Sequence, residues 1–258
     1  MPVNRAEVLA AFDREMRREV VADGPDTEVE RDGDVVRQVG PEDGWNGVLW
    51  SGLRGDGADA DAAIAAQVRH FGALGRAFEW KVYGHDRPAD LGSRLEAAGF
   101  TPEPAETLMV ARAAAIPGAP VPDGVRLAPV IDQEGVELVA DVHDAAFGAG
   151  RVRIRERLLA QLAAGSVVAV VAMAGDVPIS AARMDLHPGT RFAGLWGGGT
   201  VPEWRGRGVY RALVAYRARE AVARGHEFLQ VDASDQSHPI LLRLGFAELT
   251  TTTPYVHP

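Results

Sequence analysis

The feature that most constrains this chain of 258 residues is a glycine-rich segment at residues 196–210, Trp-Gly-Gly-Gly-Thr-Val-Pro-Glu-Trp-Arg-Gly-Arg-Gly-Val-Tyr. An amphipathic stretch begins directly after it, at Arg211. This order predicts a strand, a tight loop and a helix. The first turn of a helix leaves backbone N–H groups unpaired at the positive end of the helix dipole. The segment therefore predicts an anion site, and a phosphate group is the expected ligand.

Two common kinds of phosphate loop do not fit these residues. A Walker loop needs a lysine that reaches the outer phosphates, but the only lysine of the chain is Lys81. The dinucleotide fingerprint needs a third glycine that lets the helix pack close to the strand, and Arg211 stands at that place. A nucleoside triphosphatase and a nicotinamide or flavin enzyme are both disfavoured.

The pattern that remains, Arg-Gly-Arg-Gly-Val-Tyr at residues 205–210, resembles the Arg/Gln-x-x-Gly-x-Gly/Ala loop of the GNAT superfamily of N-acetyltransferases. In that family the loop binds the pyrophosphate of acetyl-CoA. Arg205 takes the first place and Gly208 the fourth, whereas the sixth holds Tyr210 and is expected to narrow the approach to the phosphates. The resemblance implies that acetyl-CoA contacts Gly199, Thr200 and Val201 through its pantetheine arm, and Arg205, Gly206, Arg207, Gly208, Val209 and Tyr210 through its pyrophosphate.

The order of elements after the loop supports this resemblance. Helical spacing continues to Gly225, a glycine that predicts the helix end, and residues 228–231 are typical of a buried strand. A short helix with Pro239 in its first turn leads to Gly245-Phe246, and residues 250–256 predict a closing strand. The same order is a feature of GNAT domains, so the resemblance covers most of residues 124–258.

The two halves of the chain repeat each other at low similarity. Residues 74–80 parallel 224–228 in placing a helix end before a strand, and residues 95–100 parallel 241–246 in approaching a Gly-Phe pair. A proline-rich stretch separates the halves. We therefore predict an α/β fold with two GNAT-like domains, each a mixed, mostly antiparallel sheet flanked by helices. Their predicted ranges are 1–112 for the first domain, 113–122 for the linker and 123–258 for the acetyl-CoA-binding domain.

The first domain is expected to be degenerate. Where its phosphate loop should stand, residues 53–61 carry Asp56, Asp59 and Asp61, whose charges repel a phosphate. The spacing is also similar to a calcium loop, but the glutamate that such a loop requires is missing, and a turn with an aspartate helix cap explains the segment better. We expect no metal site there and no acetyl-CoA in the first domain.

The acid and base of the reaction are less well defined by the sequence. Many GNAT enzymes carry a tyrosine general acid four residues before the glycine of Gly-Phe, and this chain has Leu241 there. Water remains an alternative, and the side chains that could replace the tyrosine are Ser234, Ser237, His238 and Tyr255. The candidate bases are Asp185, His187, Glu203 and Asp232, of which we favour Asp232 and Glu203. Each has a structural alternative as a helix cap, a core residue or a surface residue.

Composition narrows the class of protein further. The chain has no cysteine, no apolar run long enough to span a bilayer and no signal-type N-terminus, so a cytoplasmic protein without membrane attachment is expected. Residues 1–118 carry 21 acidic and 13 basic side chains, a net charge of −8 out of −9. This excess of negative charge argues against nucleic acid as a ligand and favours a cationic partner.

We therefore predict an acetyl-CoA-dependent N-acetyltransferase, without a metal, that acts on the amine of a small molecule by direct transfer in a ternary complex. A catalytically inactive CoA-binding or regulatory protein is the alternative. A homodimer formed through the first domain is also left open.

Overall fold

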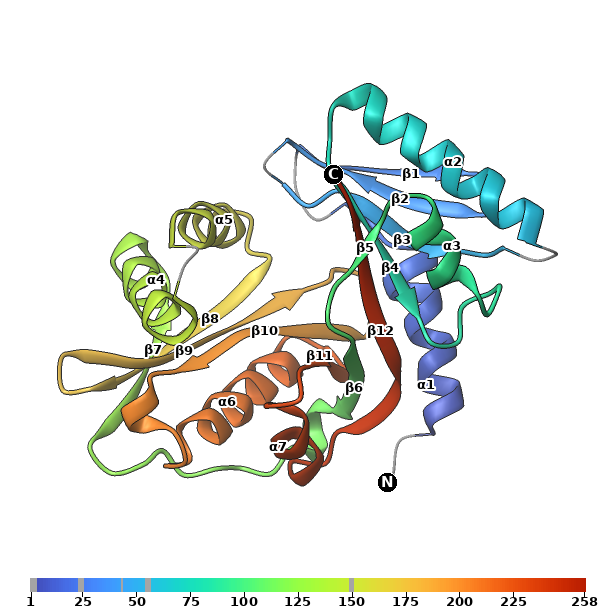
Figure 1. Ribbon diagram of the computed structural model, residues 1–258. Coiled ribbons are helices and arrows are strands. Elements are labelled where there is room, and N and C mark those ends of the chain that lie inside the picture. Colours follow the sequence, from blue (N-terminus) through green and yellow to red (C-terminus); the bar gives the residue numbers. More distant parts are fainter. Residues whose placement is uncertain (1–3, 23–25, 43, 54–56, 149–150) are drawn as a thin grey trace. The chain divides into compact units, whose positions relative to one another are not determined.

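The structure is a computed structural model that describes residues 4–22, 26–42, 44–53, 57–148 and 151–258 (Figure 1). Its contacts divide the chain into two compact units. Unit 1 comprises residues 1–109, 232–239 and 248–258, and unit 2 comprises residues 110–231 and 240–247. The division differs from the predicted range 123–258, because it groups the C-terminal strand with the first half of the chain.

Unit 1 is built on the strand order β1-β2-β3-β4-β12. The pairs are antiparallel except β3 with β4, which is parallel, and β5 adds a short pairing to β12. Its strands are β1 (Glu28–Asp32), β2 (Val35–Val39), β3 (Gly47–Ser51), β4 (Phe78–Tyr83), β5 (Thr101–Pro102), the first part of β6 (Glu106–Arg112) and most of β12 (Ala247–His257). Its helices are α1 (Arg5–Phe12), the π-helical turn η1 (Asp13–Arg18), α2 (Gly57–Leu74) and α3 (Leu91–Ala97).

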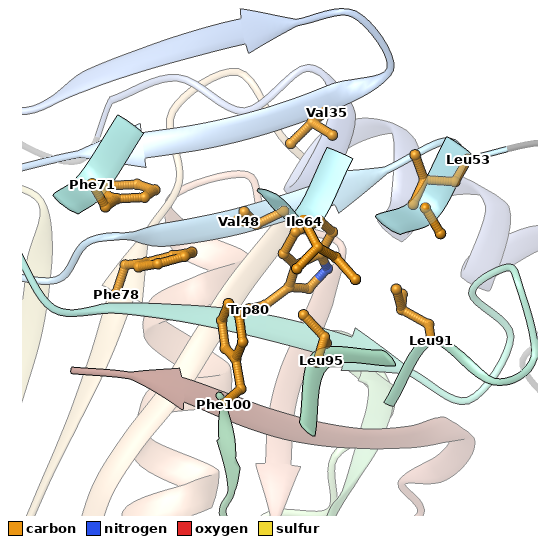
Figure 2. Close-up of a cluster of buried hydrophobic side chains, with 11 residues drawn as sticks. Val35, Val48, Leu53, Ile64, Phe71, Phe78, Trp80, Leu91, Leu95 and Phe100 are labelled. Carbon is orange, nitrogen blue, oxygen red and sulfur yellow. The ribbon is translucent and has the colours of Figure 1, made fainter. Parts of the chain in front are cut away.

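The core of unit 1 lies between α2, α3 and the sheet (Figure 2). Trp80 of β4 is fully buried at its centre, and Ile64 of α2 and Leu95 of α3 pack in the same cluster. Phe71 stacks on Phe78 with 4.3 Å between the ring centroids. Apolar residues at helical spacing on α2 thus meet alternating apolar residues on the strands, as binary patterning requires.

Unit 2 is built on the strand order β11-β10-β9-β8-β7. The pairs are antiparallel except β10 with β11, which is parallel. The strands are β7 (Val125–Val130), β8 (Val167–Ala174), β9 (Val177–Leu186), β10 (Phe192–Thr200) and β11 (Phe228–Ala233), whose last two residues the division places in unit 1. The helical elements are η2 (Ala113–Ala115), α4 (Gln133–Phe147), α5 (Arg151–Ala163), η3 (Pro202–Trp204), α6 (Val209–Ala223) and α7 (His238–Arg243), whose first two residues the division places in unit 1.

Helices cover both faces of the sheet in unit 2: α4 and α5 lie on one face and α6 on the other (Figure 1). Alternate residues of β8 separate the two cores. Val171 packs in the cluster with α4 and α5, whereas Val170 packs in the cluster with Val209 and Leu213 of α6. The predicted α/β class with mixed, mostly antiparallel sheets is confirmed.

The two units repeat one arrangement, as the sequence predicts. In each, a strand, a long helix and a second strand form a parallel pair: β3-α2-β4 in unit 1 and β10-α6-β11 in unit 2. The glycine after each long helix has a positive φ, 64° at Gly75 and 83° at Gly225. Only glycine adopts this left-handed conformation without a steric cost, which explains why both helix ends are readable in the sequence.

The short helices end in the same way. The N–H of Phe100 donates to the carbonyl of Leu95 at 3.1 Å, and the N–H of Phe246 donates to the carbonyl of Leu241 at 3.1 Å. All four of these side chains are buried. The repeated Leu-x-x-x-Gly-Phe pattern is therefore a helix end with a buried hydrophobic contact, formed once in each unit.

None of the helices among the described residues is both long enough and apolar enough to cross a bilayer. Of the aspartate-rich segment 53–61, residues 54–56 lie outside the described residues, so the predicted turn with an aspartate helix cap falls partly on residues that the structure does not describe.

Candidate functional site

The parallel strands of unit 2 stay paired over only part of their length. β10 and β11 pair from Phe192 with Phe228 to Gly194 with Gln230, and the register ends there. β10 continues to Thr200 while it still pairs with β9. On its β11 side, the main chain of β10 beyond Gly194 is therefore open to an extended ligand, which could add backbone hydrogen bonds as a further strand would.

The glycines of this stretch form a bulge. The register between β10 and β9 shifts between Trp196 and Gly199, and Gly197 has a φ of 57°. A bulge therefore lies at residues 197–199, and it bends the strand just after the two parallel strands part. The hydroxyl of Ser180 donates to the carbonyl of Gly199 at 2.6 Å, which anchors the far end of the bulge to β9.

The loop that follows leads into α6, which begins two residues earlier than predicted. Gly206 and Gly208 have φ values of 75° and 89°, and Gly208 is the residue that caps the helix. The Nε of Arg205 donates to the carbonyl of Thr200 at 3.0 Å, and the N–H of Val201 donates to the carbonyl of Ile179 at 3.0 Å. The loop is thereby fixed to the strand end, and the first N–H groups of α6 form the cradle that an anion requires.

Two cationic side chains border this cradle. Arg205 and Arg207 are exposed, and the guanidinium of Arg207 lies 4.8 Å from the ring centroid of Trp204. Stacking on an aromatic ring orients a guanidinium while leaving its N–H groups available. The loop therefore combines backbone donors, a helix N-terminus and two arginines, which suits a diphosphate.

Tyr210, the departure from the family pattern, lies differently from what the sequence suggests. Its ring lies beside Gly198, where an added Cβ would come within 2.8 Å of Tyr210 Cε2. Burial raises the pKa of the Tyr210 hydroxyl, which lies next to the buried guanidinium of Arg217 on the next turns of α6. The side chain thus faces the strand, and the expected narrowing of the phosphate approach is not seen.

Polar side chains gather at the point where the strands part. A Cβ added to Gly194 would lie 2.7 Å from Trp196 Nε1, 2.8 Å from Gln230 Nε2 and 3.3 Å from His187 Nε2. The glycine therefore makes room for three nitrogen-bearing side chains, of which Trp196 and Gln230 lie on β10 and β11 and His187 follows β9. Sequence patterns predicted His187 as a candidate but missed Trp196 and Gln230, because only the register of β10 with β11 reveals their proximity.

Asp185, another candidate base, lies on β9, the strand that pairs with β10, and its side chain is buried. It accepts a hydrogen bond from Gln161 Nε2 at 3.2 Å and lies 3.8 Å from a guanidinium nitrogen of Arg157. Both partners belong to α5. These contacts explain Asp185 as a link between the sheet and α5.

The favoured base Asp232 and both candidate serines belong to unit 1. Asp232 Oδ2 lies 2.5 Å from the Nζ of Lys81, and its Oδ1 has no hydrogen-bond partner among the described residues. Burial favours the neutral form of Lys81, but Asp232, Tyr83 and Glu79 together outweigh burial, so the pKa of the ammonium is raised. Ser234 and Ser237 are brought together, with 3.4 Å between their hydroxyl oxygens.

The remaining candidates are dispersed. Glu203 is exposed in η3 of unit 2, and Leu241 is fully buried, so its side chain is part of the core. His238 Nε2 lies 2.6 Å from Glu248 Oε1 within unit 1. Tyr255 also belongs to unit 1, where its hydroxyl is so close to Gly92 that an added Cβ would lie 2.2 Å away. Tyr255 and Gly92 are among the residues that line a cavity of about 250 Å³.

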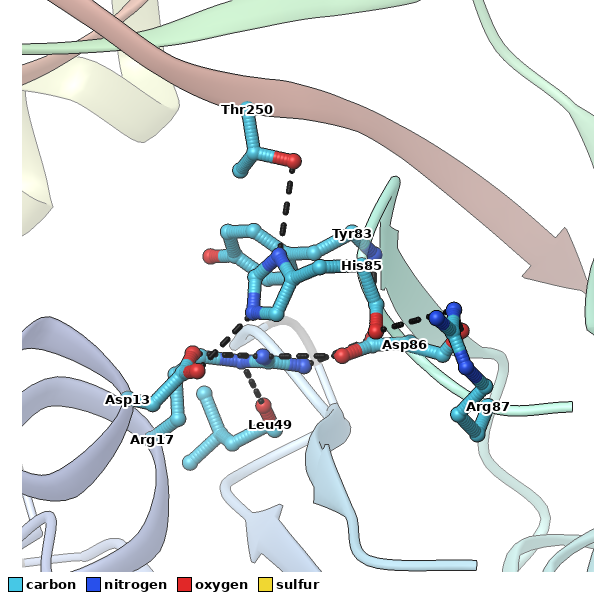
Figure 3. Close-up of polar contacts among 8 residues, drawn as sticks. All are labelled: Asp13, Arg17, Leu49, Tyr83, His85, Asp86, Arg87 and Thr250. Carbon is cyan, nitrogen blue, oxygen red and sulfur yellow. Dashed lines mark hydrogen bonds and ion pairs between the residues drawn. The ribbon is translucent and has the colours of Figure 1, made fainter. Parts of the chain in front are cut away.

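The parallel strands of unit 1 also part early, but a side chain of the same unit fills the opening. β3 and β4 pair only from Gly47 to Val48, and beyond this point Arg17 Nε donates to the carbonyl of Leu49 at 3.0 Å (Figure 3). The Arg17 guanidinium forms two hydrogen bonds to Asp86, at 3.0 and 2.7 Å, and lies 3.9 Å from the ring centroid of Tyr83. The strand carbonyl that a bound ligand would use therefore already has a partner.

The same network includes a histidine. Asp13 Oδ1 accepts from Arg17 at 2.8 Å, while Asp13 Oδ2 lies 2.8 Å from His85 Nε2 (Figure 3). His85 Nδ1 lies 3.3 Å from the hydroxyl of Thr250 on β12. Burial raises the pKa of Asp13, but the bonds from His85 and Arg17 outweigh burial and lower it below its ordinary value.

Solved structures resemble the chain over almost its whole length. A GCN5-related N-acetyltransferase from Kribbella flavida matches with a TM-score of 0.73 at 19% identity, over 100% of this chain and 96% of that one. A functionally unknown conserved protein from Staphylococcus epidermidis matches with a TM-score of 0.70 at 14% identity, over 93% and 96% of the two chains. A tandem GNAT protein from the clavulanic acid biosynthesis pathway matches with a TM-score of 0.64 at 15% identity, over 98% and 93%.

No protein-family model and no curated protein matches the sequence. The structural matches nevertheless show the fold: the chain has a GNAT fold in a tandem arrangement. At these identities the likeness establishes the fold, and the activity has to be argued from the site.

Proposed function

We propose that unit 2 binds acetyl-CoA and transfers its acetyl group to the amine of a small molecule. The observation that carries the proposal is the end of the β10–β11 register at Gly194 and Gln230, directly before a bulge and a glycine-capped helix N-terminus. The pantetheine arm would lie along the open side of β10, and the pyrophosphate would bind the loop from Arg205 to Tyr210. The tandem GNAT protein among the structural matches supports the same assignment.

The reaction follows from this placement. The amine nitrogen attacks the thioester carbonyl, a C–N bond forms as the C–S bond breaks, the amine loses a proton and the CoA thiolate gains one. The site contributes chiefly by holding both reactants in a ternary complex. For the proton of the amine we keep Asp232 and Glu203 as proposed acceptors, and the free Oδ1 of Asp232 favours the former. Ser234 and Ser237 are the proposed proton donors to the thiolate.

Isothermal titration with acetyl-CoA, combined with detection of released CoA thiol over a panel of amines, tests the proposal. The key variant is Gly208→Asp, because a side chain at a φ of 89° is strained and its carboxylate repels the pyrophosphate. Gly175→Asp is the matched control, since Gly175 also has a positive φ of 57° but lies in the β8–β9 turn.

The expected result is binding and thiol release in the wild type and in Gly175→Asp, and loss of both in a folded Gly208→Asp protein. Binding without any thiol release would instead identify an inactive CoA-binding protein. No binding of acetyl-CoA by the wild type would refute the proposal.

A further inference from the structure

Arg183 is a cation on the same sheet face as the side chains that gather where β10 and β11 part. β9 pairs Arg183 with Trp196, and Ala181, two residues earlier on β9, packs in the cluster formed with α4 and α5. Because side chains alternate along a strand, Arg183 points to this face as well. A Cβ added to Gly197 would lie 3.9 Å from both Cγ and Nε of Arg183, which places the side chain beside the bulge.

Among the described residues, no carboxylate lies within ion-pair distance of the Arg183 guanidinium. Its Nε is buried without a hydrogen-bond partner, and no side-chain hydrogen bond or ion pair of Arg183 is formed within the described ranges. Asp185, the nearest acidic group on β9, is already engaged by Gln161 and Arg157. An unpaired charge of this kind is costly to bury, and it indicates a site that an anion completes.

Electrostatics agree with this interpretation. Burial lowers the pKa of the Arg183 guanidinium, and Asp185 only partly offsets this effect. The positive charge of Arg157 lowers it further. The fully buried Arg17, by contrast, forms ion pairs with two carboxylates, those of Asp13 and Asp86. Arg183 has no such ion pair among the described residues.

The groups next to Arg183 are also hydrogen-bond donors. Trp196 Nε1 and Gln230 Nε2 converge on Gly194, at the end of the β10–β11 register. An indole N–H and an amide NH₂ complement oxygen atoms. A ligand with a carboxylate on Arg183 and its amine toward the parted strands would lie beside these groups.

We propose that Arg183 binds the anionic group of the acceptor, so that the substrate of unit 2 is an amine that also carries a carboxylate. The proposal rests on the proposed acetyl transfer at the parted strands and specifies its substrate class. A planar guanidinium binds a carboxylate through two parallel hydrogen bonds, which would also orient the amine. Arg183 is then a specificity-determining residue.

The experiment compares matched amines at saturating acetyl-CoA, with CoA thiol release as the readout. Each common amino acid is paired with its C-terminal amide, and phosphoethanolamine is paired with ethanolamine to separate a carboxylate from a phosphate. The proteins are the wild type, Arg183→Gln and, as a control, Arg126→Gln, which removes an exposed arginine of β7 in the same unit.

The expected result is a preference of the wild type for amino acids over their amides of about tenfold or more in kcat/KM. Arg183→Gln should lose this preference while keeping its rate with the amides, and Arg126→Gln should behave as the wild type. Equal rates for acids and amides, an equal loss on both in Arg183→Gln, or a preference for phosphoethanolamine alone would overturn the proposal.

If the protein binds acetyl-CoA but acetylates no amine, the proposed transfer fails and a binding readout decides the inference. The probes are then N-acetylphenylalanine and N-acetylphenylalaninamide in thermal unfolding. Stabilisation by the acid alone, lost in Arg183→Gln, supports an anion site at Arg183. The absence of any difference between the two probes overturns it.

Discussion

The ring of Tyr210 packs directly against the backbone of Gly198 in unit 2. The ring of Tyr210, on the first turn of α6, lies so close to the Gly198 backbone that an added Cβ would be 2.8 Å from Cε2. The family pattern has a small residue at the position of Tyr210. Here the large residue is accommodated by a glycine in the facing strand, which keeps the cradle at Gly208 free of the ring.

Gly198→Ala is expected to lower the free energy of unfolding by about 1–3 kcal/mol, because the methyl group forces the Tyr210 ring to move. It should also weaken acetyl-CoA binding, since β10 and α6 frame the proposed cofactor site. Adding Tyr210→Ala should rescue part of the loss. Urea unfolding of both single variants and the double variant measures the coupling, and additive effects would contradict it.

Gly72→Ala is the control for this substitution. Gly72 lies inside α2, and an added Cβ would meet no atom within 4 Å. Alanine has the higher helix propensity, so this variant should be as stable as the wild type or up to about 1 kcal/mol more stable.

Arg17→Met is expected to destabilise the protein by about 3–5 kcal/mol in urea unfolding. The substitution leaves Asp86 buried without its counterion, and the two side chains are each only 2% exposed. Adding Asp86→Asn should recover part of this loss, because the amide oxygen can still accept the Tyr83 N–H. Arg14→Met is the control: its ion pair with Glu15 is 48% exposed on the arginine side, so a change under about 1 kcal/mol is expected.

One acetyl-CoA per chain is the expected stoichiometry in isothermal titration. The opening between β3 and β4 is filled by Arg17, whose Nε already binds the carbonyl of Leu49. Hydrogen exchange should therefore show protection by acetyl-CoA at residues 195–211 and none at residues 47–53. A stoichiometry of two, or protection of β3, would mean that Arg17 is displaced by the cofactor.

Local signals account for what the sequence could predict. The positive φ of Gly225 and the Gly-Phe pair at Phe246 are set by neighbours in the chain, so composition and spacing reveal them. The same holds for the loop at Gly208 and for the repeat of two similar units. These features established the α/β class and the candidate cofactor loop.

Long-range partners could not be predicted in this way. Arg17 and Asp86 are 69 positions apart, and Lys81 and Asp232 are 151 apart. The residue pattern of a strand does not show which other strand it pairs with. The pairing of β12 with β4 could therefore not be predicted. Arg183 gave no signal, because the sequence around it does not reveal that its buried Nε lacks a hydrogen-bond partner.

Asp232→Asn tests the proposed base. If Asp232 accepts the proton of the amine, kcat should fall by about 10²–10⁴ while the affinity for acetyl-CoA stays unchanged. Lys81→Met is the matched variant, because it removes the partner of Asp232 Oδ2 but keeps the carboxylate. It should cost stability with a smaller loss of kcat. Equal losses of kcat in both variants would assign the pair a structural role, and Glu203→Gln would then be tested in the same assay.

His226 is expected to make the stability of the protein depend on pH between about 5 and 7. Burial lowers the pKa of His226 below its ordinary value, an effect to which Arg224 adds and which a backbone hydrogen bond with Thr190 opposes. The unfolded chain therefore takes up a proton at a higher pH than the native protein. The stabilisation is present above the unfolded pKa of about 6.5 and is lost as the pH falls toward the folded pKa.

His226→Gln removes this titration, so the difference in unfolding free energy between pH 7.5 and pH 5 should be smaller than in the wild type. Urea unfolding at the two pH values measures it. Some dependence should remain, because burial also lowers the pKa of His70, with a further contribution from Arg37. The direct check is the titration of the His226 ring by NMR: a pKa at or above about 6.5 in the folded protein would rule out the effect.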